Sequence, residues 1–257
     1  MISGSAPPER GMAAMDAIWD HLRLAYGAHL LWPSYTQVDD SIGYVTRVYP
    51  GVKENGSIFS HPNAWPVIAE AMLGRGNRAW EYYLTMAPTR FNDRTEVRRA
   101  EPYAYCQFLY GRDHPWFGRA ENPWLTGTAG WMYAAATQHI LGVRPAWDAL
   151  LVDPCIPPDW GGFTVTRQWR GGTYRITVEN PDSVSAGVAR AMLTAQSGDG
   201  SSTIRGTDPA ADLATLAAGH LLPIAADPRT GRRVARLPEA PGQTVDVLTT
   251  LGDGPAV

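Results

Sequence analysis

Apolar residues in the first half of the chain recur every three or four positions, the pattern of amphipathic helices. Between residues 30 and 60 no helical period appears, and loops of this length in compact domains are often functional. Residues 1–12 are small, polar and proline-bearing and are predicted to be a disordered N-terminus. We expect helices over residues 13–29, 65–73, 77–87, 102–110 and 128–141, a charged connection at 89–100 and a loop at 111–126.

The periodicity changes near Pro145, where a repeat of two replaces the helical repeat. The glycine pair Gly171-Gly172 predicts a tight hairpin turn between two of the strands. The sequence therefore indicates an α+β fold, all helical to about residue 145 and β-rich over residues 146–257. We expect strands at residues 149–152, 163–169, 174–178 and 244–251, a Gly/Ser/Asp loop at 197–207 and an alanine-rich stretch of uncertain type at 209–219.

Composition narrows the possible partners. The formal net charge is -3, which gives no reason to expect nucleic acid or an acidic membrane surface as a partner. No apolar run approaches the roughly 18 to 20 residues that a membrane span requires, and no signal-peptide pattern opens the sequence, so a cytoplasmic location is expected. Cys106 and Cys155 are predicted to be buried free thiols. Ten Trp and eleven Tyr suit either an aromatic core or a carbohydrate site.

Two polar stretches carry the candidate chemistry. Residues 50–63 crowd charge, amide, glycine and imidazole together just before a predicted helix, and residues 124–131 place threonine and glycine before another. Our hypothesis is that these stretches meet to hold an anion beside a sugar.

Residues 13–180 resemble the C-terminal part of the inverting disaccharide phosphorylases of glycoside hydrolase family 94. The resemblance implies that residues 13–145 are the later helices of an (α/α)6 barrel and residues 146–257 a C-terminal sheet domain. Beyond about residue 182 the likeness fades. The matching segments are residues 50–63, 69–76, 101–103, 124–131, 140–145, 153–157 and 166–167.

The resemblance implies phosphorolysis of a β-linked disaccharide. Phosphate, as co-substrate, attacks the anomeric carbon opposite the leaving sugar and gives an inverted sugar 1-phosphate, so no cofactor or metal is expected. In the family, the residues matching His61, Thr126 and Gly127 contact phosphate. Their structural alternatives are a hydrogen-bonded histidine and a helix N-cap with its turn. An upstream family arginine would complete the phosphate site.

Sugar contacts are implied by the same resemblance. Lys53 and Glu54 match positions near the sugar-binding loop, with a solvated ion pair as the alternative. The run containing Tyr44 and Val48 is more similar to the chitobiose-acting branch than to the cellobiose-acting one, so we expect an N-acetylglucosamine disaccharide. The roles of Glu101 and Tyr103 stay open between packing and sugar contact. Trp124 and Trp131 are expected in the core.

The general-acid aspartate of the family stands in a GGDWND-like motif that this sequence lacks, so no catalytic residue is assigned here. We therefore expect a fragment, a truncation or one half of a split gene, that is inactive alone. Exposed apolar helix faces of an incomplete barrel would need a partner chain. The family also implies a homodimer. The alternatives are a non-catalytic carbohydrate-binding remnant or scaffold, and an inverting hydrolase of (α/α)6 type.

Overall fold

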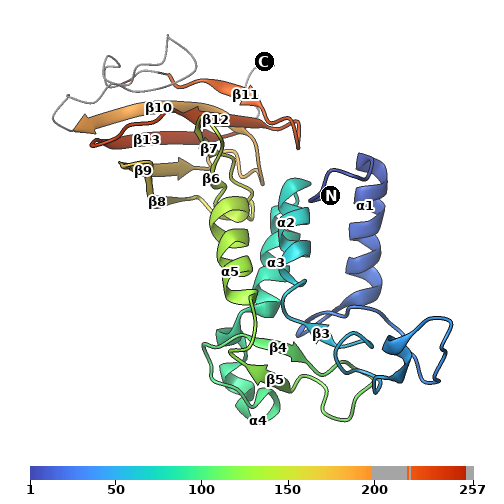
Figure 1. The fold of residues 1–257 in the computed structure, drawn as a ribbon. Coiled ribbons are helices and arrows are strands. Elements are labelled where there is room, and N and C mark those ends of the chain that lie inside the picture. Colours follow the sequence, from blue (N-terminus) through green and yellow to red (C-terminus); the bar gives the residue numbers. More distant parts are fainter. Residues whose placement is uncertain (198–218, 220, 253–257) are drawn as a thin grey trace. The chain divides into compact units, whose positions relative to one another are not determined.

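The structure, a computed structural model, describes residues 1–197, 219 and 221–252. Helices and sheets both occur, which confirms the α+β class (Figure 1). The loop predicted at residues 197–207 and the alanine-rich stretch predicted at 209–219 lie outside the described part, apart from residues 197 and 219. The chain forms two compact units, Met1–Glu70 with Arg78–Ala135 and Ala71–Asn77 with Ala136–Val257.

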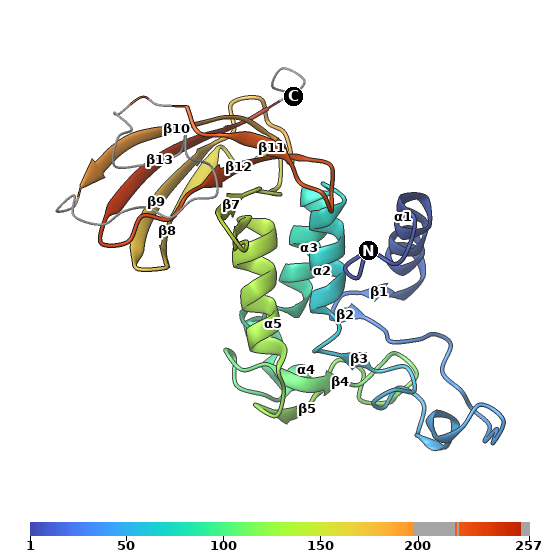
Figure 2. The same ribbon diagram turned by 45° about the horizontal axis from the view of Figure 1, so that its top comes forward.

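Helices α2, α3 and α5 lie side by side in both views (Figures 1 and 2). Helix α2 spans Ala64–Met72, α3 spans Gly76–Met86, and α5 spans Thr128–Ala134 and continues as a π-helical segment over Ala135–Ile140. These helices confirm the periodic predictions for residues 65–73, 77–87 and 128–141. Helix α2 ends before Gly74 and the π-helical segment ends before Gly142, and both glycines have positive φ as the left-handed end of a helix requires.

The first helix differs from the prediction at both ends. Helix α1 spans Pro8–Ala17 and continues as a π-helical turn to Leu22, rather than running over residues 13–29. Proline is favourable in a first helical turn, which explains the earlier start. The helix stops because Arg23–Leu24 (β1) pairs with Gly27–Ala28 (β2). Gly27 has φ 123°, and a Cβ there would lie within 2.9 Å of the side chains of Met86, Ile58 and Asn63.

The predicted helix at residues 102–110 is wrong. Its second half is strand β4 (Cys106–Leu109), the centre of a three-stranded antiparallel sheet with β3 (Ile58–Phe59) and β5 (Ala120–Pro123). This pairing buries Cys106, Phe108 and Leu109 through partners distant in sequence, which a local period cannot reveal. The half up to residue 145 is therefore not all helical. Short helical turns also replace the charged connection, at Pro88–Arg94 and at Thr95–Arg98 (α4).

The second unit contains two four-stranded sheets, ordered β10-β13-β9-β8 and β11-β12-β7-β6. Strands β11 and β12 contact β10, so one sheet lies against the other (Figure 2). Strand β13 lies between β10, to which it is antiparallel, and β9, to which it is parallel. The strands are β6 Val143–Pro145, β7 Leu150–Val152, β8 Gly162–Trp169, β9 Gly172–Glu179, β10 Val188–Ser197, β11 Ile224–Ala226, β12 Arg233–Leu237 and β13 Thr244–Leu251.

The four predicted strands are confirmed as β7, β8, β9 and β13. The hairpin turn between β8 and β9 is displaced by one residue, because Trp169 pairs with Gly172 and leaves Arg170 and Gly171 at the bend. Both bend residues have positive φ, 46° and 79°, as a tight two-residue hairpin demands. Strands β6, β10, β11 and β12 were not predicted.

A buried ion network joins the β11-β12-β7-β6 sheet to the turns that flank its strands. Asp153, with a fully buried side chain, accepts Arg144 Nη1 at 2.8 Å and Arg232 Nη2 at 2.8 Å. Arg144 also pairs with Asp227, and Arg232 donates to the Ala71 carbonyl at the end of α2. Removing one partner of such a buried pair strongly destabilises the fold, because the other charge would be left unpaired.

Candidate functional site

His61 lies in a turn between β3 and α2 that is held on both sides. Before it, the Ser60 N–H donates to the Gln107 carbonyl at 3.0 Å, beside the β3–β4 pairing. After it, the buried Asn63 amide accepts the Ala28 N–H at 2.6 Å and donates to the carbonyls of Ala28 and Phe59 at 3.0 and 2.8 Å. A saturated, buried amide fixes the backbone at both ends of the turn. The His61 ring therefore projects from a rigid base.

The threonine-glycine stretch forms the start of α5. Gly127 occupies the N-cap position with φ -82° and ψ 4°. The Thr126 hydroxyl accepts the Thr128 N–H at 3.1 Å and lies 2.5 Å from the Thr128 hydroxyl. Thr126 thus bonds the first N–H of α5 from the residue before the N-cap, while the N-cap residue Gly127 itself makes no side-chain bond to the helix. The Gly127 surface itself is exposed.

The structure brings the two stretches together. A Cβ placed on Gly127 would lie 3.2 Å from His61 Cε1 and 3.5 Å from Nδ1, so the glycine backbone faces the imidazole directly. Two tryptophans flank the ring, Trp131 at 5.8 Å and Trp65 at 6.4 Å between ring centroids. Because Gly127 has no side chain, the space in front of the His61 imidazole stays open. The rings of Trp65 and Trp131 flank that imidazole.

A cleft of about 290 Å³ opens beside His61. Glu54 from the 50–63 stretch lines it together with Phe59 and Trp65, so the structure places one predicted sugar-binding carboxylate in the same cleft as the imidazole. Among the described residues that line the cleft, Lys53, Val48 and Tyr44 do not appear. Thr126 and Gly127 do not line it either, so two of the seven predicted site residues, His61 and Glu54, line this cleft and five do not.

Tyr44, Val48 and Lys53 belong to an adjoining loop. Tyr44 begins a 3-10 turn over residues 44–47 and is 80% exposed. Lys53 is exposed and has φ 44°. The Val48 carbonyl accepts the side chain of Asn55 at 2.7 Å, and Asn55 also bonds both backbone groups of Tyr35. Asn55 therefore fixes this loop in the way that Asn63 fixes the His61 turn.

Two tryptophans expected in the core are exposed. Trp124 is 63% exposed and Trp131 is 38% exposed. Trp124 has φ 70°, which turns its side chain out of the sheet edge, and its indole N–H donates to Glu101 at 3.1 Å. Trp131 lies on the open side of α5, facing Trp65. The side chain of Tyr103 packs edge-on against Trp124. Glu101 and Tyr103 therefore both contact Trp124 at the surface.

Asn55 and Asn63 were not assigned roles from sequence. Both stand inside the 50–63 stretch, and both are buried with hydrogen-bonded amides. A signal was present, because a polar amide next to glycine or proline in a long loop often bonds the backbone. The sequence alone did not show which backbone groups the amides of Asn55 and Asn63 would bond.

Other kinds of site find little support in the described part of the chain. Within it, no three His, Cys, Asp or Glu side chains come together as metal ligands would. Nor does any of its helices have the length and apolar character needed to cross a membrane. Both cysteines are buried and neither forms a disulfide, as predicted, and burial raises the pKa of the Cys106 thiol.

Comparison with known proteins identifies the family of the chain. Residues 1–142 match the family model described as glycosyl hydrolase 94 superfamily, catalytic domain. The matched region contains the His61 turn and the start of α5.

Several curated relatives are phosphorylases. The chain is 60% identical over 193 residues to N,N'-diacetylchitobiose phosphorylase of Vibrio proteolyticus, covering 75% of this chain and 24% of that protein. It is 55% identical over 199 residues to the enzyme of the same name from Vibrio furnissii, covering 77% and 25%. Solabiose phosphorylase of Paenibacillus borealis is 36% identical over 193 residues, covering 75% and 25%. The chain thus spans about a quarter of the length of these relatives. With more than half of its residues matching the family's catalytic domain, the chain belongs to the glycosyl hydrolase 94 superfamily.

Proposed function

We propose that the chain contributes the phosphate side of an inverting disaccharide phosphorylase. His61, Thr126 and Gly127 hold inorganic phosphate, and Glu54 contacts the sugar. The observation that carries the proposal is the approach of Gly127 to the His61 ring, where a Cβ would be 3.2 Å from Cε1. His61 and Gly127, 66 positions apart in sequence, thereby face one space, and only glycine leaves that space open.

Phosphate suits this space on chemical grounds. It is already an anionic nucleophile, so the site needs donors and orientation rather than a base. An imidazole, a threonine hydroxyl and backbone N–H groups beside a glycine supply such donors. The phosphate oxygen forms a bond to the anomeric carbon while the bond to the leaving sugar oxygen breaks. That oxygen takes a proton from a carboxylic acid, and the product is a sugar 1-phosphate of inverted configuration.

The general acid in this proposal comes from the part of the family's catalytic domain that this sequence does not include. The described helices then belong to the later part of an (α/α)6 barrel. We further propose an N-acetylglucosamine disaccharide as substrate, with Lys53, Val48 and Tyr44 near the acceptor sugar once the site is complete. The two Vibrio relatives, named for N,N'-diacetylchitobiose, support that choice.

Phosphate binding by the chain alone provides the first test. Inorganic phosphate is titrated into protein labelled with ¹⁵N in its histidine rings, and the His61 signals are expected to move in a saturable way. In calorimetry the variant His61→Ala should bind phosphate more weakly than wild type, whereas His21→Ala, at an exposed position of the π-helical turn, should not. Equal phosphate affinity in wild type and His61→Ala would contradict the proposal.

Reconstituted activity provides the second test. The chain is mixed with the N-terminal part of the Vibrio proteolyticus relative, N,N'-diacetylchitobiose and phosphate, and sugar 1-phosphate is measured. An inverting hydrolase is the second candidate, because Glu54 lines the His61 cleft and a carboxylate can activate water. Release of free sugar at a rate independent of phosphate would favour hydrolysis and overturn phosphorolysis.

A further inference from the structure

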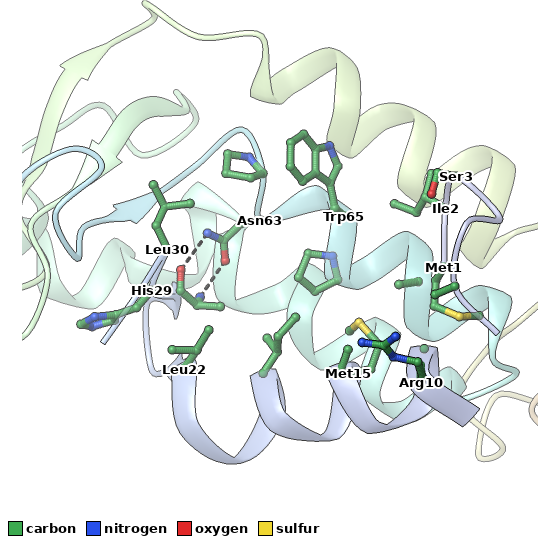
Figure 3. A pocket seen from close by; sticks show the side chains of 18 of the residues that line it. Met1, Ile2, Ser3, Arg10, Met15, Leu22, His29, Leu30, Asn63 and Trp65 are labelled. Carbon is green, nitrogen blue, oxygen red and sulfur yellow. Dashed lines mark hydrogen bonds between the residues drawn. The ribbon is translucent and has the colours of Figure 1, made fainter. Parts of the chain in front are cut away.

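The groove along α1 and α2 in the first unit has a mainly apolar lining (Figure 3). Its volume is about 680 Å³, and Asn63, a polar residue on its wall, already bonds the backbone of Ala28. A cavity of the opposite character lies in the second unit, where arginine, histidine and aspartate side chains line it. The phosphorylase chemistry proposed above makes no use of these side chains.

Residues from several segments converge on this charged cavity. His139 comes from the π-helical continuation of α5, Arg144 from β6, and Asp153 from the residue directly after β7. Arg229 and Arg232 come from the turn between β11 and β12. The centre of a water-sized sphere can move through only about 10 Å³ of the cavity. There is therefore room for one small ion or one water molecule, and not for a larger ligand.

The guanidinium groups on the wall carry more donors than their partners accept. Arg144 donates to Asp153 and Asp227. Arg232 donates to both oxygens of Asp153 and to the Ala71 carbonyl. These five bonds use about half of the N–H donors of the two groups. Both side chains are largely buried, 12% and 16% exposed, so their spare donors favour an acceptor inside the cavity.

The electrostatic potential at the His139 ring is positive. Burial lowers the pKa of this ring to about 4, together with the charges of Arg144, Arg229 and Arg232. Among the described residues, no carboxylate shifts that pKa in the opposite direction. Asp153 shares the wall, but both of its oxygens already accept guanidinium N–H groups. A negative ion in the cavity would thus be attracted by three cations, and the neutral imidazole can donate its N–H to it.

We infer that this cavity binds a single monatomic anion, chloride in the cell, between Arg144, Arg229 and Arg232. The size of the space excludes phosphate, whose four oxygens need more room, and the arginines repel a metal cation. The bound ion links the end of the α5 helical segment to the β11–β12 turn, so its role is to stabilise the second unit. The inference does not depend on the proposed phosphorylase function.

A chloride titration at constant ionic strength tests the inference. Chloride replaces gluconate, an anion too large for the cavity, in protein labelled with ¹⁵N in its histidine rings. We expect the His139 signals, identified by their loss in His139→Gln, to shift in a saturable way with chloride and not with phosphate. The His61 signals report on the phosphate site separately, so either proposal can fail while the other stands.

Two exposed arginines with similar contacts provide matched variants. Arg229 Nη2 lies 3.8 Å from Met72 Sδ beside the cavity, and Arg190 Nη2 lies 3.2 Å from Met192 Sδ on β10, outside the cavity lining. Arg229→Gln removes one of the three cations, and the dissociation constant for chloride should rise at least about tenfold. Arg190→Gln changes the net charge equally and should alter that constant less than about twofold.

Urea denaturation gives a second readout, because an ion that binds only the folded chain raises the unfolding midpoint. Chloride should raise the midpoint of wild type and Arg190→Gln more than that of Arg229→Gln. The absence of a chloride-dependent His139 shift would overturn the inference, since the cavity would then hold water alone. Equal chloride affinities in the two arginine variants would also overturn it, as would a shift that does not saturate and affects all histidine rings alike.

Discussion

Replacing Gly127 by alanine tests the approach of the two stretches with one methyl group. The backbone of Gly127, at φ -82° and ψ 4°, is one that alanine adopts without strain. The new Cβ would lie 3.2 Å from His61 Cε1, 3.5 Å from Nδ1 and 3.9 Å from Nε2. The imidazole, which is half-buried, has to move by a few tenths of an ångström, and the methyl group occupies the proposed phosphate space.

The effect on folding should be small because two contributions oppose each other. Alanine reduces the conformational freedom of the unfolded chain, which stabilises by about 0.4–1 kcal/mol. Alanine is also a poorer N-cap than glycine, which costs about 0.5–1 kcal/mol. We therefore expect the free energy of unfolding, from urea denaturation, to stay within about 1 kcal/mol of wild type. Phosphate should bind roughly tenfold more weakly, equivalent to about 1.4 kcal/mol and comparable to one lost hydrogen bond to a charged group.

Gly130→Ala is the matched control in the same helix. A Cβ on Gly130 meets no atom within 4 Å, so this variant should bind phosphate like wild type and gain up to about 1 kcal/mol in stability from helix propensity. Wild-type phosphate affinity in Gly127→Ala would refute the assigned geometry. Equal losses in both glycine variants would show that the effect comes from the helix rather than from the space before His61.

Three further predictions concern the folded chain. Asp153→Asn should lower the free energy of unfolding by about 3–5 kcal/mol, because two buried guanidinium groups lose their shared carboxylate, whereas Asp148→Asn in a half-exposed ion pair should cost less than about 1 kcal/mol; similar losses in urea denaturation would contradict this. Burial and nearby arginines lower the pKa of His139 from 6.5 to about 4, so the unfolded chain binds the extra proton first as the pH falls. Stability should therefore decrease between pH 6.5 and pH 4 by up to about 3 kcal/mol, and His139→Gln should flatten that slope; an unchanged slope would rule out His139 as its origin. Cys106 and Cys155 are 2% and 0% exposed, so a thiol reagent should modify both only after denaturant is added, and rapid modification of the native chain would show that one is accessible.

Long periodic segments were predictable because their pattern is local. Residues 65–73 and 128–141 repeat apolar positions at the helical period, and residues 163–178 alternate around a glycine pair. In each case the element that forms is the one that buries the repeated face. Strand β4 escaped this logic because its residues are buried by pairing with β3 and β5, which lie about 50 and 14 positions away. The local pattern of apolar residues does not show which strands will pair with β4.

The candidate site was likewise predictable from the sequence only in part. The approach of Gly127 to His61 was expected from the resemblance of both stretches to a family, not from spacing. The exposure of Trp131 was missed, since a tryptophan in a helix usually faces a core. In this structure that face borders an open groove. The amides of Asn55 and Asn63 were missed as well, because their partners are backbone groups chosen by the tertiary fold.

The place of β13 has a consequence for synthesis of the protein. Residues 244–251 leave the ribosome after β8, β9 and β10, yet they occupy the middle of that sheet and pair with both β9 and β10. Until they emerge, the nascent chain carries two unpaired strand edges, each able to pair with a neighbouring polypeptide. The sheet can therefore close only after β13 has left the ribosome, and stalling before that point should favour aggregation.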